Sequence, residues 1–169
     1  MPHTAPDQTN EAGEQRPPAG VKQWHGPGLW RRVGNVITGL LARAGIGPVH
    51  LLTTRGRKTG QARTNPVLPV EHAGKRWLVA PYGTVSWVHN ARAAGRVSLR
   101  HGRKTRDYAI REVSPGEAGP ILKRYVASAG ITRPYFRAGK DSPVDDFAAE
   151  ADSHPVFELT PLAEAGPNT

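Results

Sequence analysis

The side chains best suited to binding chemistry are gathered in residues 51–67, a stretch rich in cations, hydroxyls and glycine. Residues 51–54 are expected to form a strand, and a second strand is expected to return from Arg63. Gly56 and Gly60 lie between them and allow the tight and left-handed backbone that such a turn needs. The stretch carries four cations and four threonines: Arg55, Arg57, Lys58, Arg63, Thr53, Thr54, Thr59 and Thr64.

A hairpin tip of this kind brings backbone N–H groups, side-chain donors and positive charge to one place, as an anionic ligand requires. The alternative is a solvated basic hairpin without a ligand. Local composition leaves both interpretations open.

Length and composition set the frame for the whole chain. With 169 residues it is long enough for one domain with a substantial core. The chain has no cysteine, which excludes disulfides and thiolate metal sites. We find no apolar run of membrane-spanning length and no signal peptide pattern, so we expect a soluble cytoplasmic protein.

The net charge of +9 is distributed unevenly. Residues 15–106 contain seventeen Lys or Arg and one acid, Glu71, whereas residues 107–169 contain six basic and ten acidic residues. The positive potential therefore belongs to the part of the chain that holds the hairpin, which favours an anionic partner there.

The chain is expected to form one folded domain, residues 24–162, between a disordered tail at 1–23 and a short tail at 163–169. Apolar residues at three- and four-residue spacing predict a helix over 27–44. Two placements are open for this basic amphipathic helix: packing on its own domain, or lying on the anionic inner face of the membrane as a peripheral contact.

Alternating and periodic patterns predict the remaining elements. The strand at 65–72 contains two prolines, so it is expected at a sheet edge or at a bulge beside a ligand. Residues 128–152 are expected to be an irregular lid or binding loop. Further strands are expected at 75–80, 96–100, 105–113 and 154–160, with helices over 85–94, capped by Thr84 and Gly95, and after the capping box Ser114–Glu117. Together they predict an α+β fold, a small barrel or curled sheet with helices outside.

Familiar catalytic patterns are missing from the sequence. The seven histidines are scattered without a second ligand at metal-binding spacing, so we expect no metal site. Neither a nucleophile elbow nor a complete phosphate loop is present. If the protein is an enzyme, its chemistry is expected to come from a cofactor.

Two motifs resemble the deazaflavin-dependent nitroreductase and quinone reductase family of actinobacteria. The first is the whole stretch from Leu51 to Pro66, and the second is the helix Trp87-Val88-His89-Asn90 followed by a strand. The resemblance spans about residues 30–160, with matching spacing between the motifs.

This resemblance implies a split β-barrel of the flavin-reductase kind, antiparallel, with helices packed outside. It also implies the deazaflavin coenzyme F420, which carries a phosphate and a polyglutamate tail, with FMN as the alternative cofactor. The implied cofactor site comprises Arg57, Lys58, Thr59, Gln61, Arg63, Asn65, Pro66 and Val67 on the hairpin, and Ala80, Pro81, Tyr82, Gly83, Trp87, Val88 and Asn90 on the other wall.

The acceptor side of the implied site is assigned to tyrosines, since a phenol can both stack and donate a proton. Tyr82 and Tyr135 are the catalytic candidates, while Tyr125 is expected to pack in the core. Many family members carry a longer Ser-Lys-Gly-Gly-type loop where this chain has residues 81–84, and their tyrosine-rich C-terminal pattern is not reproduced. The acceptor, whether a quinone, a nitro compound or an activated alkene, is therefore left open.

Two other classes of function remain open. One is a carrier that holds a cofactor or lipid without turnover. The other is a binder of nucleic acid or anionic membranes, although the aromatics are not interleaved with cations as a nucleic-acid platform needs. The protein is expected to be a monomer or a homodimer.

Overall fold

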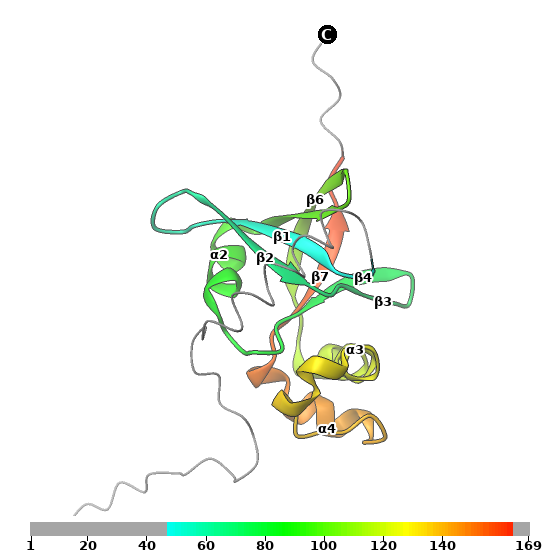
Figure 1. Cartoon of the computed structure of the whole chain (residues 1–169). Coiled ribbons are helices and arrows are strands. Elements are labelled where there is room, and N and C mark those ends of the chain that lie inside the picture. The colour runs from blue at the N-terminus through cyan, green and yellow to red at the C-terminus, as the bar shows by residue number, and fades with distance from the viewer. Residues whose placement is uncertain (1–46, 164–169) are drawn as a thin grey trace, which may run out of the picture.

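The computed structural model describes residues 47–163 of the chain. The predicted tail at 1–23, the predicted helix over 27–44 and residues 164–169 lie outside this part. The described residues contain a curled antiparallel sheet with one helix against it and a group of short helices at one end (Figure 1).

The sheet has seven strands in the order β2-β1-β5-β6-β7-β4-β3. Every neighbouring pair is antiparallel. The strands are β1 (His50–Arg55), β2 (Ala62–Val67), β3 (Val70–His72), β4 (Lys75–Val79), β5 (Arg96–His101), β6 (Lys104–Glu112) and β7 (Val156–Pro161).

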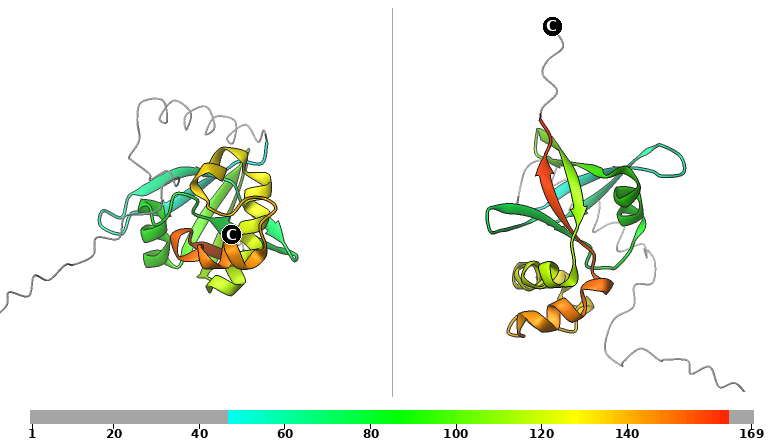
Figure 2. Two further views of the ribbon diagram at one scale, coloured as in Figure 1. Left: turned by 90° about the horizontal axis from the view of Figure 1, so that it is seen from below. Right: turned by 180° about the vertical axis from the view of Figure 1, so that it is seen from behind.

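The prediction of one strand over 65–72 is wrong. The segment forms two strands, β2 and β3, which lie at opposite edges of the sheet and are joined only by Leu68 and Pro69. Because two residues can span only about 7 Å, the sheet must curl until its edges meet. Pro66 does lie at an edge, as predicted, since it is in β2, whereas Pro69 lies in the connection between the two strands. The result is the predicted split β-barrel, which the two views of Figure 2 show from other sides.

The interior of the barrel is filled from the sheet and from helix α2 (Ser86–Ala94). Val88 and Leu52 are fully buried there. The predicted N-cap Thr84 is wrong by one position, because the cap residue is Val85, without a capping side-chain bond. Gly95 ends the helix with a φ of 65°, as predicted.

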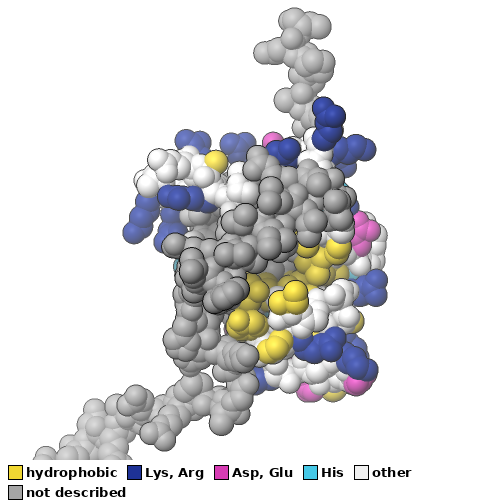
Figure 3. Space-filling model, in the orientation of Figure 1, with side chains coloured by type: hydrophobic (Ala, Val, Ile, Leu, Met, Phe, Trp, Pro, Cys, Tyr) yellow, Lys and Arg dark blue, Asp and Glu magenta, His cyan; other side chains and the backbone are white. Residues whose placement is uncertain are grey.

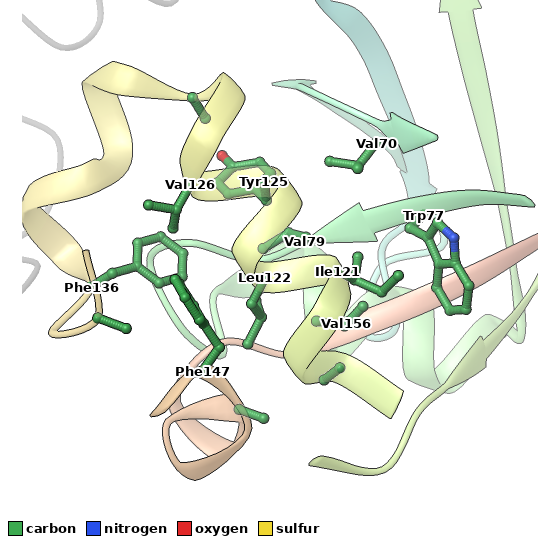
Figure 4. Close-up of a cluster of buried hydrophobic side chains, with 14 residues drawn as sticks. Val70, Trp77, Val79, Ile121, Leu122, Tyr125, Val126, Phe136, Phe147 and Val156 are labelled. Atoms are coloured by element: carbon green, nitrogen blue, oxygen red, sulfur yellow. The ribbon is translucent and has the colours of Figure 1, made fainter. Parts of the chain in front are cut away.

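A helical layer closes one end of the molecule, where the sequence indicated an irregular segment. It comprises α3 (Pro115–Ser128), η1 (Gly130–Tyr135), α4 (Val144–Ala149) and η2 (Ala151–Ser153), so the irregular assignment of 128–152 is wrong. Phe147 of α4 is fully buried against α3 and Phe136 in a second core, distinct from that of the barrel (Figure 4). The predicted capping box of α3 is confirmed, since the Ser114 backbone N–H donates to the Glu117 carboxylate over 3.2 Å.

Candidate active site

The tip of the β1–β2 hairpin is a closed backbone turn. The Gly56 N–H donates to the Gln61 carbonyl over 2.8 Å, and the Gly60 N–H donates to the Gly56 carbonyl over 2.7 Å. Gly60 has a φ of +68°, the left-handed conformation predicted for it. A Cβ on Gly56 would lie 3.1 Å from both the Gln61 carbonyl and the Thr59 hydroxyl, so a side chain there would crowd the turn.

The hairpin tip is attached to α2 by Asn90. This side chain is only 6% exposed, and its Oδ1 accepts the backbone N–H of Arg57 over 3.2 Å and the Arg57 guanidinium over 3.5 Å. Two sequence-predicted residues are thereby brought together. A buried amide that holds a backbone N–H fixes the start of the turn, and a projecting hairpin gains a defined direction.

Four exposed cations surround this tip. In the part of the chain that the structure describes, none of them forms an ion pair, although five other Lys or Arg side chains do. Figure 3 shows Lys and Arg gathered around the projecting hairpin, whereas apolar side chains gather nearer the helical layer. The four unpaired cations are Arg55, Arg57, Lys58 and Arg63.

The other predicted walls of the site differ in exposure. Asn65, Pro66 and Val67 of the edge strand β2 are half-buried, and so are Tyr82 and Gly83. The loop Ala80–Gly83 leads directly into α2, so the hairpin tip and this loop are joined through one short helix. Thr59 and Gln61 are exposed at the tip, whereas Ala80 and Pro81 are buried.

Two predicted residues of α2 have little free surface. Trp87 is 7% exposed and packs against Phe157 with ring centroids 5.9 Å apart, and Val88 is fully buried. Both side chains therefore support the helix from within the barrel. Their contact with a cofactor stays a prediction.

The structure brings the two candidate catalytic tyrosines together. The rings of Tyr82 and Tyr135 lie edge to face, with centroids 4.8 Å apart and planes at 89°. They come from the β4–α2 loop and the end of η1, more than fifty positions apart in sequence. Tyr125, as expected, packs in the core at 3% exposure, and burial raises its pKa to about 12.

Sequence reasoning missed a buried polar pair beside these tyrosines. Glu150 and His154 are 4% and 5% exposed, and His154 Nε2 lies 3.8 Å from Glu150 Oε2. Their four-residue spacing was the available signal, but it fell in a segment without helical periodicity. Thr54 was also misjudged, because its hydroxyl is buried and without a hydrogen-bond partner among the described residues, and does not face a surface ligand.

Within residues 47–163, no three His, Asp or Glu side chains are grouped so that they could hold a metal ion. No helix in that range is long and apolar enough to cross a membrane. The predicted cytoplasmic location stays a prediction.

The donor set fits an elongated cofactor with an anionic end and an aromatic end. Unpaired cations and turn amides suit phosphate and carboxylates, while a half-buried edge strand and two phenol rings suit a flat ring. A curled barrel with these features belongs to the split-barrel class of cofactor-binding proteins.

The family model described as F420H(2)-dependent quinone reductase matches residues 30–136, well over half of the sequence. The chain belongs to this family. It is an F420-dependent reductase, and coenzyme F420 is the cofactor that the family uses.

Solved structures are similar to this chain as well. An F420-H2 dependent reductase (FDR-A) is 29% identical, over 67% of this chain and 94% of that one, with a TM-score of 0.48. A domain-swapped dimer is 26% identical, over 78% of this chain and 97% of that one, with a TM-score of 0.50. Atu2129 of Agrobacterium tumefaciens, a protein of unknown function, is 13% identical over 76% of this chain and 55% of that one, with a TM-score of 0.53, and shows a likeness of fold alone.

Proposed function

We propose that this protein reduces a small organic acceptor, a quinone, a nitro compound or an activated alkene, with a hydride that reduced coenzyme F420 supplies when bound. The observation that supports the site is the group of unpaired cations at a hairpin tip that a buried amide holds in place. Exposed cations that do not pair with a carboxylate of residues 47–163 remain available to an anionic ligand.

The proposed cofactor site divides into an anion end and a ring end. Arg57, Lys58 and Arg63 bind the phosphate and carboxylates of the cofactor tail, and the neighbouring Thr59 and Gln61 add uncharged donors. At the ring end, residues 65–67 of β2 form one wall, and the loop 80–83 with the start of α2 forms the other. Both walls are half-buried or buried, which limits water beside the ring.

The proposed acceptor side is formed by the tyrosine pair. Each acceptor class takes up a hydride and a proton, with loss of water where a nitro group becomes a nitroso group, and a phenol hydroxyl of Tyr82 or Tyr135 donates the proton. Solvent then reprotonates the phenolate. The edge-to-face contact limits the rotation of both rings, so a donor is held beside the acceptor without a further ordering cost.

The binding half of the proposal is tested by fluorescence titration of the purified protein with oxidised F420, beside FMN, at two salt concentrations. Saturable binding of F420 that FMN does not match is expected. Arg57→Ala or Lys58→Ala should each weaken binding by about 10- to 100-fold, because a charge-assisted hydrogen bond contributes about 1.5–3 kcal/mol. Arg124→Ala, which removes an exposed arginine from α3, is the matched control and should leave the affinity unchanged.

The turnover half is tested with reduced F420 and one acceptor of each class. Tyr82→Phe and Tyr135→Phe should lower turnover while leaving the dissociation constant of F420 within about twofold, since neither hydroxyl is assigned to the anion end. Binding without turnover of any acceptor would favour a carrier. Failure to bind either cofactor would overturn the proposal, and steeply salt-dependent binding of nucleic acid or anionic vesicles would then take its place.

A further inference from the structure

A buried imidazole lies where the two tyrosine-bearing segments meet. His154 follows η2 and is 5% exposed, and no role follows for it from the proposed cofactor contacts. Its ring stacks on Phe136, the residue after Tyr135, with centroids 4.0 Å apart and planes at 27°. One face of the imidazole thus supports the segment that carries Tyr135.

The opposite side of His154 adjoins the segment that carries Tyr82. The backbone of Ala80 and Pro81 favours the protonated form of the ring, although Nδ1 makes no hydrogen bond to the described residues. The Ala80 N–H donates to the Pro155 carbonyl over 2.9 Å, and a Cβ on Gly83 would lie 3.3 Å from the Ser153 carbonyl. The loop 80–83 therefore contacts Ser153 and Pro155, the residues on either side of His154.

Glu150 extends this support to the chain after η1. Its Oε2 accepts the backbone N–H of Arg137 over 3.0 Å, and its Oε1 accepts that of Ala138 over 3.1 Å. A carboxylate that is 4% exposed and accepts two backbone N–H groups holds that backbone firmly. Glu150 and His154 together join three segments that are distant in sequence.

We propose that Glu150 and His154 are positioning residues, which fix the two segments that carry Tyr82 and Tyr135 and thereby set the edge-to-face contact of the phenol rings. The pair does not touch the acceptor in this assignment. A buried carboxylate beside a buried imidazole is seldom retained for stability alone, because removing polar groups from water offsets much of what their contacts contribute. A role in holding the two tyrosine-bearing segments accounts for the burial of Glu150 and His154 better than a role in stability alone.

The charges around the imidazole predict how this support responds to acid. Burial lowers the pKa of His154 below its ordinary value, Arg137 lowers it further, and Glu150 with the two carbonyls opposes the decrease. Tyr125, on the α3 side of the second core, is uncharged here because burial raises its pKa to about 12. His154 is therefore neutral near pH 7, and its protonation in acid places a new charge beneath the tyrosine loops.

NMR of the free, full-length protein tests this assignment without cofactor or acceptor. In a pH titration of the wild type, the ring signals of Tyr82 and Tyr135 should shift with the same midpoint pH as those of the His154 imidazole. Below that pH the contact between the two tyrosine rings should weaken. In His154→Gln, which cannot be protonated, that pH-dependent shift should disappear. His89→Gln, which replaces an exposed histidine of α2, is the control and should retain it.

The link to catalysis rests on the proposed function and has its own readout. His154→Gln and Glu150→Gln should lower acceptor turnover by about 10- to 100-fold, since small displacements of positioned groups carry costs of this order. The dissociation constant of F420 should stay within about twofold of the wild-type value. If F420 does not bind to the wild type, the proposed function fails, while the NMR experiment still decides the positioning role.

If the ring signals of Tyr82 and Tyr135 in the wild type do not change as His154 is protonated, the inference is wrong. This test needs only the wild type, so it holds even if neither variant folds. The inference is also wrong if Glu150→Gln leaves the ring contact and acceptor turnover unchanged.

Discussion

The two ends of the candidate site are built on opposite physical principles. The hairpin end is exposed and basic, and its described contacts with the rest of the protein include one buried amide, Asn90, on α2. The tyrosine end is half-buried: the two rings contact each other, Tyr135 packs on the second hydrophobic core, and a buried carboxylate–imidazole pair lies against the chain that follows Tyr135.

This difference matches what each end has to hold. Charge attracts a flexible anionic tail over several ångströms and tolerates small errors of position. A hydride moves only between atoms at contact distance, so the acceptor end needs fixed geometry. We infer that mutations in the helical layer affect turnover through placement, whereas mutations in the hairpin affect affinity through charge.

The largest effect is expected from a mutation in the second hydrophobic core, which supports the tyrosine end of the site. Phe147→Ala removes a fully buried ring from the second core and should cost about 3–5 kcal/mol of the free energy of unfolding. Urea denaturation measures this loss, and Ile131→Ala, which truncates a 90% exposed side chain of η1, should change almost nothing. Equal effects of the two variants would contradict a packed helical layer.

A smaller effect is expected at the hairpin end. Asn90→Ala leaves the Arg57 backbone N–H without its buried acceptor and should cost about 1–3 kcal/mol of stability. Hydrogen exchange should accelerate at residues 56–61, and F420 should bind more weakly, while the Tyr82–Tyr135 contact persists. His89→Ala on the same helix is the control. Exchange that accelerates equally in the helical layer would show that the two ends are not separate.

The smallest expected effect concerns acid stability at the start of α3. Arg111, with help from the Ser114 backbone and hydroxyl, lowers the pKa of Glu117 to about 2 from an ordinary value of 4.5. The stabilisation is therefore complete above pH 4.5 and is lost as the pH falls towards 2. Thermal unfolding of Glu117→Gln across this range should show a shallower decline than that of the wild type. An unchanged slope would place the acid sensitivity elsewhere.

Local patterns in the sequence predicted the elements that local physics determines. The left-handed Gly60, the Gly95 cap, the capping box at Ser114 and the alternation of β5 all depend on a few neighbouring residues. The basic hairpin was predicted for the same reason. The order of short strands predicted a small barrel or curled sheet, and the family resemblance narrowed this to a split β-barrel, since no local pattern states how strands are ordered in a sheet.

The predictions that were wrong concern elements whose structure depends on contacts between residues distant in sequence. Residues 65–72 separate into two strands because the barrel closes there, and no property of those residues alone requires it. The helices between 128 and 152 form because Phe136 and Phe147 find a core against α3. The partner of Asn90 and the support of the tyrosines likewise depend on segments brought together only by the fold.

The place of β7 in the sheet has a consequence for biosynthesis. Of the strands that the structure describes, β7 comes last in sequence, yet it lies between β6 and β4, and within residues 47–163 its only companion as a neighbour of β4 is β3. Until Val156–Pro161 emerge, the β3–β4 hairpin has no place in the sheet, and the apolar side chains of Trp77, Leu78 and Val79 have no final cover. During translation we therefore expect the β3–β4 hairpin to join the sheet only once β7 has been made, and we expect a chain truncated before β7 to expose apolar surface and to aggregate.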